Sequence, residues 1–284
     1  MRPLLLLLMI LSFCGFSSAQ TQASIDRMYV FGDSYSDSGR GWVDSDGPTA
    51  VAYLAHRMGL TLVPSNAHDA AEKSLNFAVS GAPTGESPGH IVPNGWLGLG
   101  MKNQVAEFVA RVHDGSIVFD ADTTLFFIAG GLNDKRISTD QTVANLEGEI
   151  QALYDAGARH FRLAILPEAI PAFSEVATRL NPAIRTIPAA MAPKLKGADI
   201  RLSQWGAYFD RVMTDAPKYK ITDTTDQCAG RAIFNEDCTP CANPASHFYY
   251  HKNHPSTAVH RIVGDMLYRE IANPREIAGS KEAH

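Results

Sequence analysis

Residues 28–39 have the sequence MYVFGDSYSDSG, a short apolar run that ends in glycine, aspartate and serine. The apolar part, 28–31, has the length of a buried strand, and the segments 74–79 and 125–129 repeat the pattern of an apolar run followed by small polar residues. Segments with the 3.6-residue spacing of amphipathic helices lie between such runs. This alternation predicts a three-layer α/β/α fold with a central parallel sheet and helices on both faces.

The rest of the chain supplies the elements that such a sheet needs. Helices are expected at 49–58, 101–112, 141–155, 194–213 and 257–271, with a further strand at 161–166. Five prolines and weak periodicity at 167–193 predict an irregular crossing segment or a lid. No repeat or change of composition marks a second domain, so residues 20–284 are expected to form a single domain.

Composition excludes some classes of protein. The 284 residues are 45% hydrophobic and 19% charged, which is enough apolar material for one sizeable core. The formal net charge is −5, and acidic and basic residues are interspersed. No run of lysine and arginine suggests a nucleic-acid surface, so no nucleic-acid partner is expected.

The first nineteen residues have the pattern of a signal peptide. Arg2 provides a positive charge, 4–13 is an apolar segment, and the small residues at 17–19 fit a cleavage site before Gln20. The chain is therefore expected to be secreted, either to the extracellular medium or to a periplasm. Three cysteines remain after cleavage, and an oxidising compartment favours a disulfide between two of them. The spacing does not indicate which two of Cys228, Cys238 and Cys241 pair.

Polar residues follow three of the predicted strands at the points where the strands end. Ser34 follows the first, Gly81 the second and Asn133 the third, while His254 precedes the last helix. Because the carboxyl ends of parallel strands converge on one crevice, these residues are expected to meet there. A histidine can activate a serine hydroxyl, and backbone N–H groups with a side-chain amide can stabilise an oxyanion. The set therefore favours acyl transfer.

Four sequence blocks together resemble the SGNH/GDSL hydrolase family. The segments 157–159 and 166–167, with the cysteine loop at about 222–246 before His254, resemble its secreted lipase, phospholipase and acyltransferase branch. Residues 31–39 are similar to the family's first block, 76–82 to its glycine block, 131–134 to Gly-x-Asn-Asp, and 254–256 to its terminal His-Pro block. They occur in the family's order and span nearly the whole mature chain. The resemblance implies a flavodoxin-like SGNH hydrolase fold that needs no cofactor.

The resemblance also assigns roles to individual residues. It implies Ser34 as the nucleophile, His254 as its base, and Ser34, Gly81 and Asn133 as the oxyanion hole. The family usually places an aspartate three residues before the histidine, but this chain has His251 there. Three outcomes stay open: a Ser–His dyad oriented by a backbone carbonyl or His251, an acid from elsewhere such as Asp223 or Asp226, or activity that is low or lost.

A zinc site is a competing interpretation of the same C-terminal region. A Cys-x-x-Cys pair followed by histidines resembles zinc-ligand spacing; the residues are Cys238, Cys241, His247, His251 and His254. A secreted chain favours disulfides instead, and the blocks already assign His254 to the base. No metal is therefore expected.

The sequence thus predicts a secreted serine esterase that hydrolyses carboxylic esters through an acyl-enzyme. The alternatives are a carbohydrate O-deacetylase of the same fold, a catalytically weakened binding protein, and a zinc-stabilised interaction domain. The expected partner is a small-molecule or lipid acyl ester. Transient contact with a lipid surface and the oligomeric state are left open by the sequence.

Overall fold

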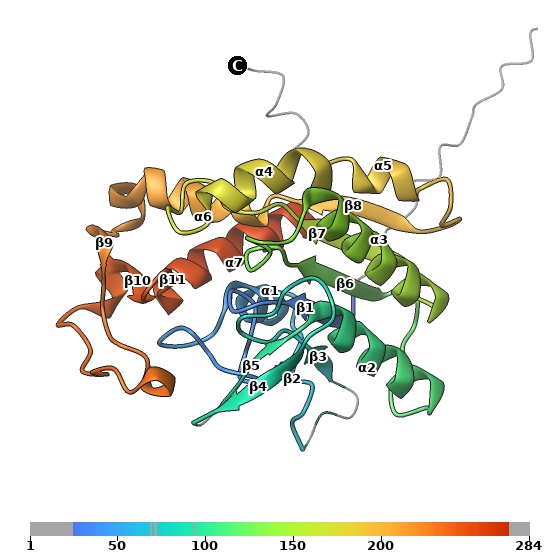
Figure 1. Ribbon diagram of the computed structural model, residues 1–284, viewed down its shortest axis with the longest axis horizontal. Helices are drawn as coiled ribbons and strands as arrows, with labels where there is room; N and C mark the ends of the chain where they lie inside the picture. The colour runs from blue at the N-terminus through green and yellow to red at the C-terminus, as the bar shows by residue number, and fades with distance from the viewer. Residues whose placement is uncertain (1–24, 69, 71–72, 94, 273–284) are drawn as a thin grey trace, which may run out of the picture.

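A computed structural model describes residues 25–272, except 69, 71–72 and 94 (Figure 1). The predicted signal peptide, residues 1–19, lies outside the described residues. Within the described ranges, no helix is both long enough and apolar enough to cross a membrane.

The centre of the fold is a six-stranded sheet in the order β2-β3-β1-β6-β7-β8, and every neighbouring pair is parallel. Its strands are β1 (Arg27–Gly32), β2 (Leu62–Pro64), β3 (Ser74–Asn76), β6 (Thr124–Ala129), β7 (His160–Ala164) and β8 (Asp199–Ser203). β6 is buried along its whole length, as its unbroken apolar sequence predicts for a strand covered on both faces. β1 pairs with it over six residues, so the strand that leads to Ser34 lies in the middle of the sheet.

Helices form the two outer layers, which confirms the predicted three-layer architecture (Figure 1). One group packs α7 against α1 and α6, and the other joins α3 to α2, α4 and α5. Their bounds are α1 (Ala50–Arg57), α2 (Met101–His113), α3 (Thr139–Asp155), α4 (Ser174–Ile184), α5 (Ile187–Met191), α6 (Trp205–Thr214) and α7 (Thr257–Ala272).

Short elements outside the three layers surround the carboxyl edge of the sheet. An antiparallel hairpin consists of β4 (Pro88–Val92) and β5 (Gly95–Leu99). A small sheet near the C-terminus combines β9 (Asp223–Gln227), β10 (His247–His251) and β11 (His254–Pro255). Three 3-10 turns complete this region: η1 (Ala216–Tyr219), η2 (Ala232–Phe234) and η3 (Pro244–Ser246).

Two sequence expectations for the second half of the chain are wrong. Residues 167–193 are not irregular, because they contain α4 and α5. Pro188 occupies the first turn of α5, where a missing N–H costs nothing. Residues 194–213 are not one helix, because β8 precedes α6. β8 is an edge strand whose charged Asp199 and Arg201 alternate with apolar residues, a pattern too short to stand out beside a helix.

Candidate active site

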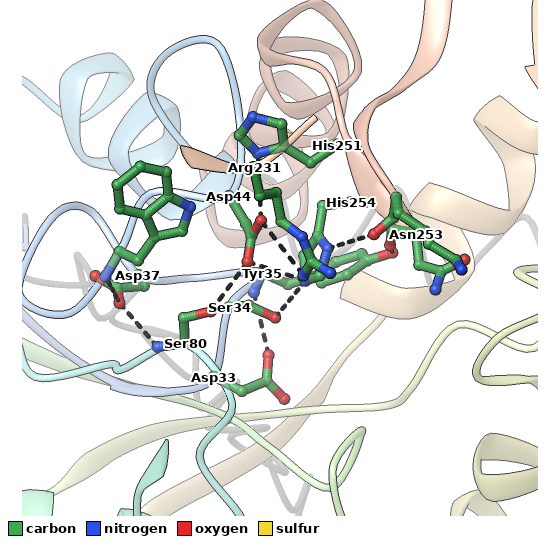
Figure 2. Close-up of polar contacts among 12 residues, drawn as sticks. Asp33, Ser34, Tyr35, Asp37, Asp44, Ser80, Arg231, His251, Asn253 and His254 are labelled. Atoms are coloured by element: carbon green, nitrogen blue, oxygen red, sulfur yellow. Dashed lines mark hydrogen bonds and ion pairs between the residues drawn. The ribbon is translucent and has the colours of Figure 1, made fainter. Parts of the chain in front are cut away.

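Ser34 and His254 meet at the carboxyl edge of the sheet (Figure 2). Ser34 lies in the turn that follows β1, and His254 opens β11 just before α7. The His254 Nε2 atom is 2.8 Å from the Ser34 Oγ atom, although 220 positions separate the two residues. Both are buried, with 6% of Ser34 and 8% of His254 exposed. The fold thus gives a serine hydroxyl a histidine partner away from bulk water.

A backbone carbonyl orients the imidazole of His254. The His254 Nδ1 atom is 2.8 Å from the carbonyl oxygen of Lys252. Because a carbonyl only accepts hydrogen bonds, Nδ1 carries the proton, and Nε2 is left free to accept one from Ser34. His251, at the position where an acid was expected, makes no contact with Nδ1 in the described part of the chain.

A carboxylate that the sequence analysis did not identify, Asp44, also lies in this site. It comes from the loop between β1 and α1, and only 3% of it is exposed. The Ser80 hydroxyl donates to its Oδ2 at 3.1 Å, and His254 Nε2 lies 3.6 Å from the same oxygen. Its Oδ1 is 3.2 Å from His251 Nδ1 and 4.0 Å from the Arg231 guanidinium. Figure 2 shows Ser80, His251, Arg231 and His254 around the Asp44 side chain.

The environment moves the pKa values of both ionisable groups downward. Burial lowers the pKa of His254 below its usual value, and the Asp44 charge and the Lys252 carbonyl offset only part of that effect. Burial alone would raise the pKa of Asp44, but the adjacent His254, His251 and Arg231 outweigh it and hold the pKa below its usual value. At neutral pH the site therefore contains a neutral His254 beside an ionised Asp44.

Three predicted oxyanion donors border the same cavity as Ser34. Within the described residues, the backbone N–H groups of Ser34 and Gly81 have no hydrogen-bond acceptor. Gly81 has φ of +80°, which glycine adopts far more readily than other residues. The Asn133 amide nitrogen donates one hydrogen to the Ala82 carbonyl at 3.0 Å, which fixes its orientation and leaves its second hydrogen available.

The cavity that joins these groups is small, with a volume of about 220 Å³. Ser34, Asp44, Gly81, Asn133 and His254 border it. Its apolar wall consists of Leu97, Phe173, Ile233 and Phe234, and its cationic rim of Arg231 and Lys252.

A buried carboxylate, Asp37, ties the loop after Ser34 to the glycine block. Its Oδ2 accepts the backbone N–H of Trp42 at 2.9 Å and that of Ser80 at 2.8 Å, and its Oδ1 accepts the N–H of Gly39 at 2.9 Å. Burial raises the pKa of Asp37 to about 6 despite these hydrogen bonds. Asp37 thereby fixes Ser80, and with it Gly81, relative to the loop that follows Ser34.

The remaining sequence candidates lie elsewhere. Cys228 and Cys241 form a disulfide, and Cys238 is exposed as a free thiol. Cys241, one member of the suggested zinc cluster, is therefore not a free thiolate. Asp223 lies 3.5 Å from His247, and neither it nor Asp226 borders the cavity.

A Gly-x-Ser-x-Gly pattern at 85–89 presents a rival nucleophile, Ser87. Ser87 leads into the β4 hairpin rather than standing on a strand-to-helix turn, which such a nucleophile requires. Its hydroxyl accepts the N–H of Gly89 at 3.4 Å, and in the described part of the chain no histidine contacts it. The local geometry therefore favours Ser34.

Two known proteins are similar to this chain over most of its length. An acetylesterase of Thermothelomyces thermophilus is 25% identical over 86% of this chain and 87% of its own length. A GDSL esterase/lipase of Arabidopsis thaliana is 23% identical over 90% of this chain and 89% of its own.

Two solved structures also match this chain. A Bacillus subtilis protein has 13% identity and a TM-score of 0.48 over 88% of this chain, which spans only 57% of that protein. A lipolytic G-D-S-L family protein of Veillonella parvula has 11% identity and a TM-score of 0.42, covering 88% of this chain and 98% of its own.

The sequence profile of the family described as GDSL-like lipase/acylhydrolase matches residues 28–267, which include most of β1, the residues that border the cavity and most of α7. The chain belongs to this family and is an ester hydrolase.

Proposed function

We propose that the protein is a secreted serine esterase for short-chain acyl esters, with Ser34 as the nucleophile and His254 as the base. The 2.8 Å contact between His254 Nε2 and Ser34 Oγ carries this proposal. It joins the two groups that acyl transfer needs, in a cavity that also holds unused hydrogen-bond donors.

The reaction would proceed through an acyl-enzyme. Ser34 Oγ attacks the ester carbonyl carbon while its proton passes to His254 Nε2. The tetrahedral intermediate collapses as the bond to the alcohol oxygen breaks, and Nε2 returns the proton to that leaving oxygen. A water molecule then attacks the acyl-Ser34 ester, with His254 again accepting and returning the proton. The products are a carboxylic acid, the alcohol and free Ser34.

The oxyanion would be stabilised by the N–H groups of Ser34 and Gly81 and by the second amide hydrogen of Asn133. Both backbone donors lack an internal acceptor within the described residues, so they are free to bind a substrate oxygen. Removing one such donor typically costs about 10²–10³ in rate. The lowered pKa of His254 keeps it unprotonated at neutral pH, as a base must be.

Cavity size supports a short acyl group. A cavity of 220 Å³ is smaller than the roughly 300–1,000 Å³ of sites that enclose drug-sized ligands. Leu97, Phe173, Ile233 and Phe234 close its wall with apolar side chains. One of the similar proteins is named an acetylesterase, which agrees with this size. An acetyl or similarly small group therefore suits the site better than a long lipid chain.

Two features support secretion. Residues 1–19 have the pattern of a signal peptide, and the Cys228–Cys241 disulfide is of a kind that persists in oxidising compartments. We infer that residues 20–284 form the mature, single-domain enzyme.

Hydrolysis of p-nitrophenyl acetate, butyrate and octanoate by the mature protein tests the proposal. We expect kcat/KM for acetate to exceed that for octanoate by at least about tenfold. Ser34→Ala and His254→Ala should each lower kcat by at least about 10³-fold, whereas Ser87→Ala, the matched serine control, should not. Equal turnover by wild type and Ser34→Ala would refute Ser34 as the nucleophile, and equal rates on all three esters would remove the short-chain preference.

A further inference from the structure

A buried negative charge lies beside the base of this site, at a position remote from the expected one. Asp44 Oδ2 is 3.6 Å from His254 Nε2, and among the described residues Asp44 supplies the only carboxylate within 4.0 Å of a His254 ring nitrogen. We propose that Asp44 is the acid of this enzyme: a positioning residue whose fixed charge stabilises the His254 imidazolium, in place of a carboxylate at position 251. The inference rests on the proposed roles of Ser34 and His254.

The reaction creates a need for such a charge. When Ser34 attacks, its proton moves to Nε2 and His254 becomes an imidazolium that is almost fully shielded from water. The Lys252 carbonyl orients Nδ1 at 2.8 Å, but it offers a dipole and no net charge. Arg231 and His251 both lower the pKa of His254 and so disfavour a positive charge on its ring. Asp44 is the group that can balance the new positive charge.

The loop that carries Asp44 is fastened to the segment that follows His254. The Ser45 hydroxyl donates to the Pro255 carbonyl at 3.0 Å, and the Thr257 N–H donates to Asp46 Oδ1 at 2.6 Å. Both contacts lie within three residues of the Asp44–His254 pair, just after Asp44 in one segment and just after His254 in the other. The distance between carboxylate and imidazole is therefore set by the backbone and not by two free side chains.

Further contacts keep Asp44 ionised and aimed at the base. The Ser80 hydroxyl donates to Oδ2, the oxygen that faces His254, at 3.1 Å. His251 Nδ1 lies 3.2 Å from Oδ1, and the His251 ring stacks on Trp42 at 6.5 Å between centroids. His251 thus lies beside Asp44, where it helps to keep the carboxylate ionised, and not beside Nδ1 of the base.

Several groups from different elements face the His254 ring. Asp44 comes from the β1–α1 loop, and the Tyr35 ring lies 5.6 Å away in the turn after β1. The charged or titratable neighbours from the other elements are Arg231 from the cysteine loop, His251 from β10 and His260 from α7. Of these, only Asp44 raises the pKa of His254, and Arg231 and His251 lower it.

The decisive experiment is the pH dependence of kcat and kcat/KM for Asp44→Asn beside Asp223→Asn. Asp223 is the acid that the sequence suggested, and it lies outside the cavity. We expect Asp44→Asn to lower the kcat plateau by about 10²–10⁴-fold with KM changed by less than about threefold. The acidic midpoint should move to lower pH, because the charge that raised the pKa of His254 is gone. Asp44→Glu should recover at least part of the rate, and Asp223→Asn should change neither quantity.

A merely structural role would give the opposite shift. A loosened loop would admit water and move the acidic midpoint up, toward the value of about 6.5 of a solvated histidine. That result, or a wild-type plateau in Asp44→Asn, would overturn the proposal. Should Asp44→Asn fail to fold, Ser80→Ala is the second variant: it keeps the Asp44 charge and removes the hydrogen bond that orients the carboxylate. A kcat unchanged within twofold in a folded Ser80→Ala variant would count against the proposal. Full activity in Ser34→Ala or His254→Ala would instead remove the proposed function itself.

Discussion

Gln104 fastens the end of β1 just before the nucleophile. This side chain, in the first turn of α2, is fully buried. Its Oε1 accepts the Gly32 N–H at 3.0 Å, and its Nε2 donates to the carbonyls of Gly32 at 2.9 Å and Leu99 at 3.0 Å. Gly32 is two positions before Ser34, so the amide of Gln104 sets where the nucleophile turn begins.

Gln104→Leu keeps a side chain of similar size and removes these hydrogen bonds. The Gly32 carbonyl retains the Val79 N–H at 3.2 Å, but the Gly32 N–H and the Leu99 carbonyl lose their partner. Each buried backbone group without a partner costs about 1–3 kcal/mol, so we expect a loss of at least about 2 kcal/mol of unfolding free energy. The corresponding fall in Tm is at least roughly 4 °C for a domain of this size.

Thermal unfolding and ester hydrolysis together check this expectation. Because a shift of about 1 Å in a reacting group can cost about 10²-fold in rate, kcat should fall at least about tenfold at temperatures where the variant is folded. Gln151→Leu is the matched control, since its exposed amide makes a single bond to Asp155 within α3. Its stability should stay within about 0.5 kcal/mol. A Gln104→Leu variant with wild-type Tm and kcat would refute the reasoning.

Three further outcomes follow from the site and its surroundings. Because burial lowers the pKa of His254 and only the neutral form acts as a base, kcat/KM should be level at neutral pH and fall only below about pH 6.5, as a pH–rate profile would show. Replacing Cys228 and Cys241 together by serine should lower the unfolding free energy by about 3 kcal/mol, as expected for a cross-link between residues 13 positions apart. An unchanged midpoint in urea unfolding would contradict this. Burial lowers the pKa of His260 to about 3, so the unfolded chain binds a proton below about pH 6.5 that the native chain does not, and stability is lost as pH falls. That loss amounts to about 2 kcal/mol at pH 5 relative to neutral pH, and urea titrations of His260→Gln should lack it.

Strong periodicity made the central part of the fold predictable. β6 is one unbroken apolar run, and α2 places buried residues such as Val105 and Phe108 on one face, so both were predicted to within a few residues. β8 has only five residues, two of them charged, and its strand character comes from pairing with β7. Tertiary contact of this kind leaves little trace in a short local pattern.

The site was predictable to the extent that its residues stand at strand ends. The structure brings Ser34, Gly81 and Asn133 to one cavity with His254, as their positions after the strands and before the last helix predicted. Asp44 could not be found in this way. It lies in a long irregular loop that contains several aspartates, and nothing in its local sequence distinguishes it from Asp46. Its importance depends on the approach of residues more than 200 positions away.

The positions of Asp44 and His251 explain why the His-Pro block alone did not show which acid assists His254. A carboxylate at position 251 would be the expected partner of Nδ1 of His254. In this chain the Lys252 carbonyl accepts from Nδ1, and the His251 ring lies against Asp44. Asp44 and His251 thus supply one carboxylate and one imidazole near the base. The carboxylate comes from the β1–α1 loop and the imidazole from β10. A carboxylate near Nε2 acts on the proton that passes between Ser34 and His254, whereas one near Nδ1 acts on the proton that stays on the ring. Removing the charge of Asp44 should therefore lower kcat without freeing the His254 ring to rotate, because the Lys252 carbonyl continues to hold Nδ1.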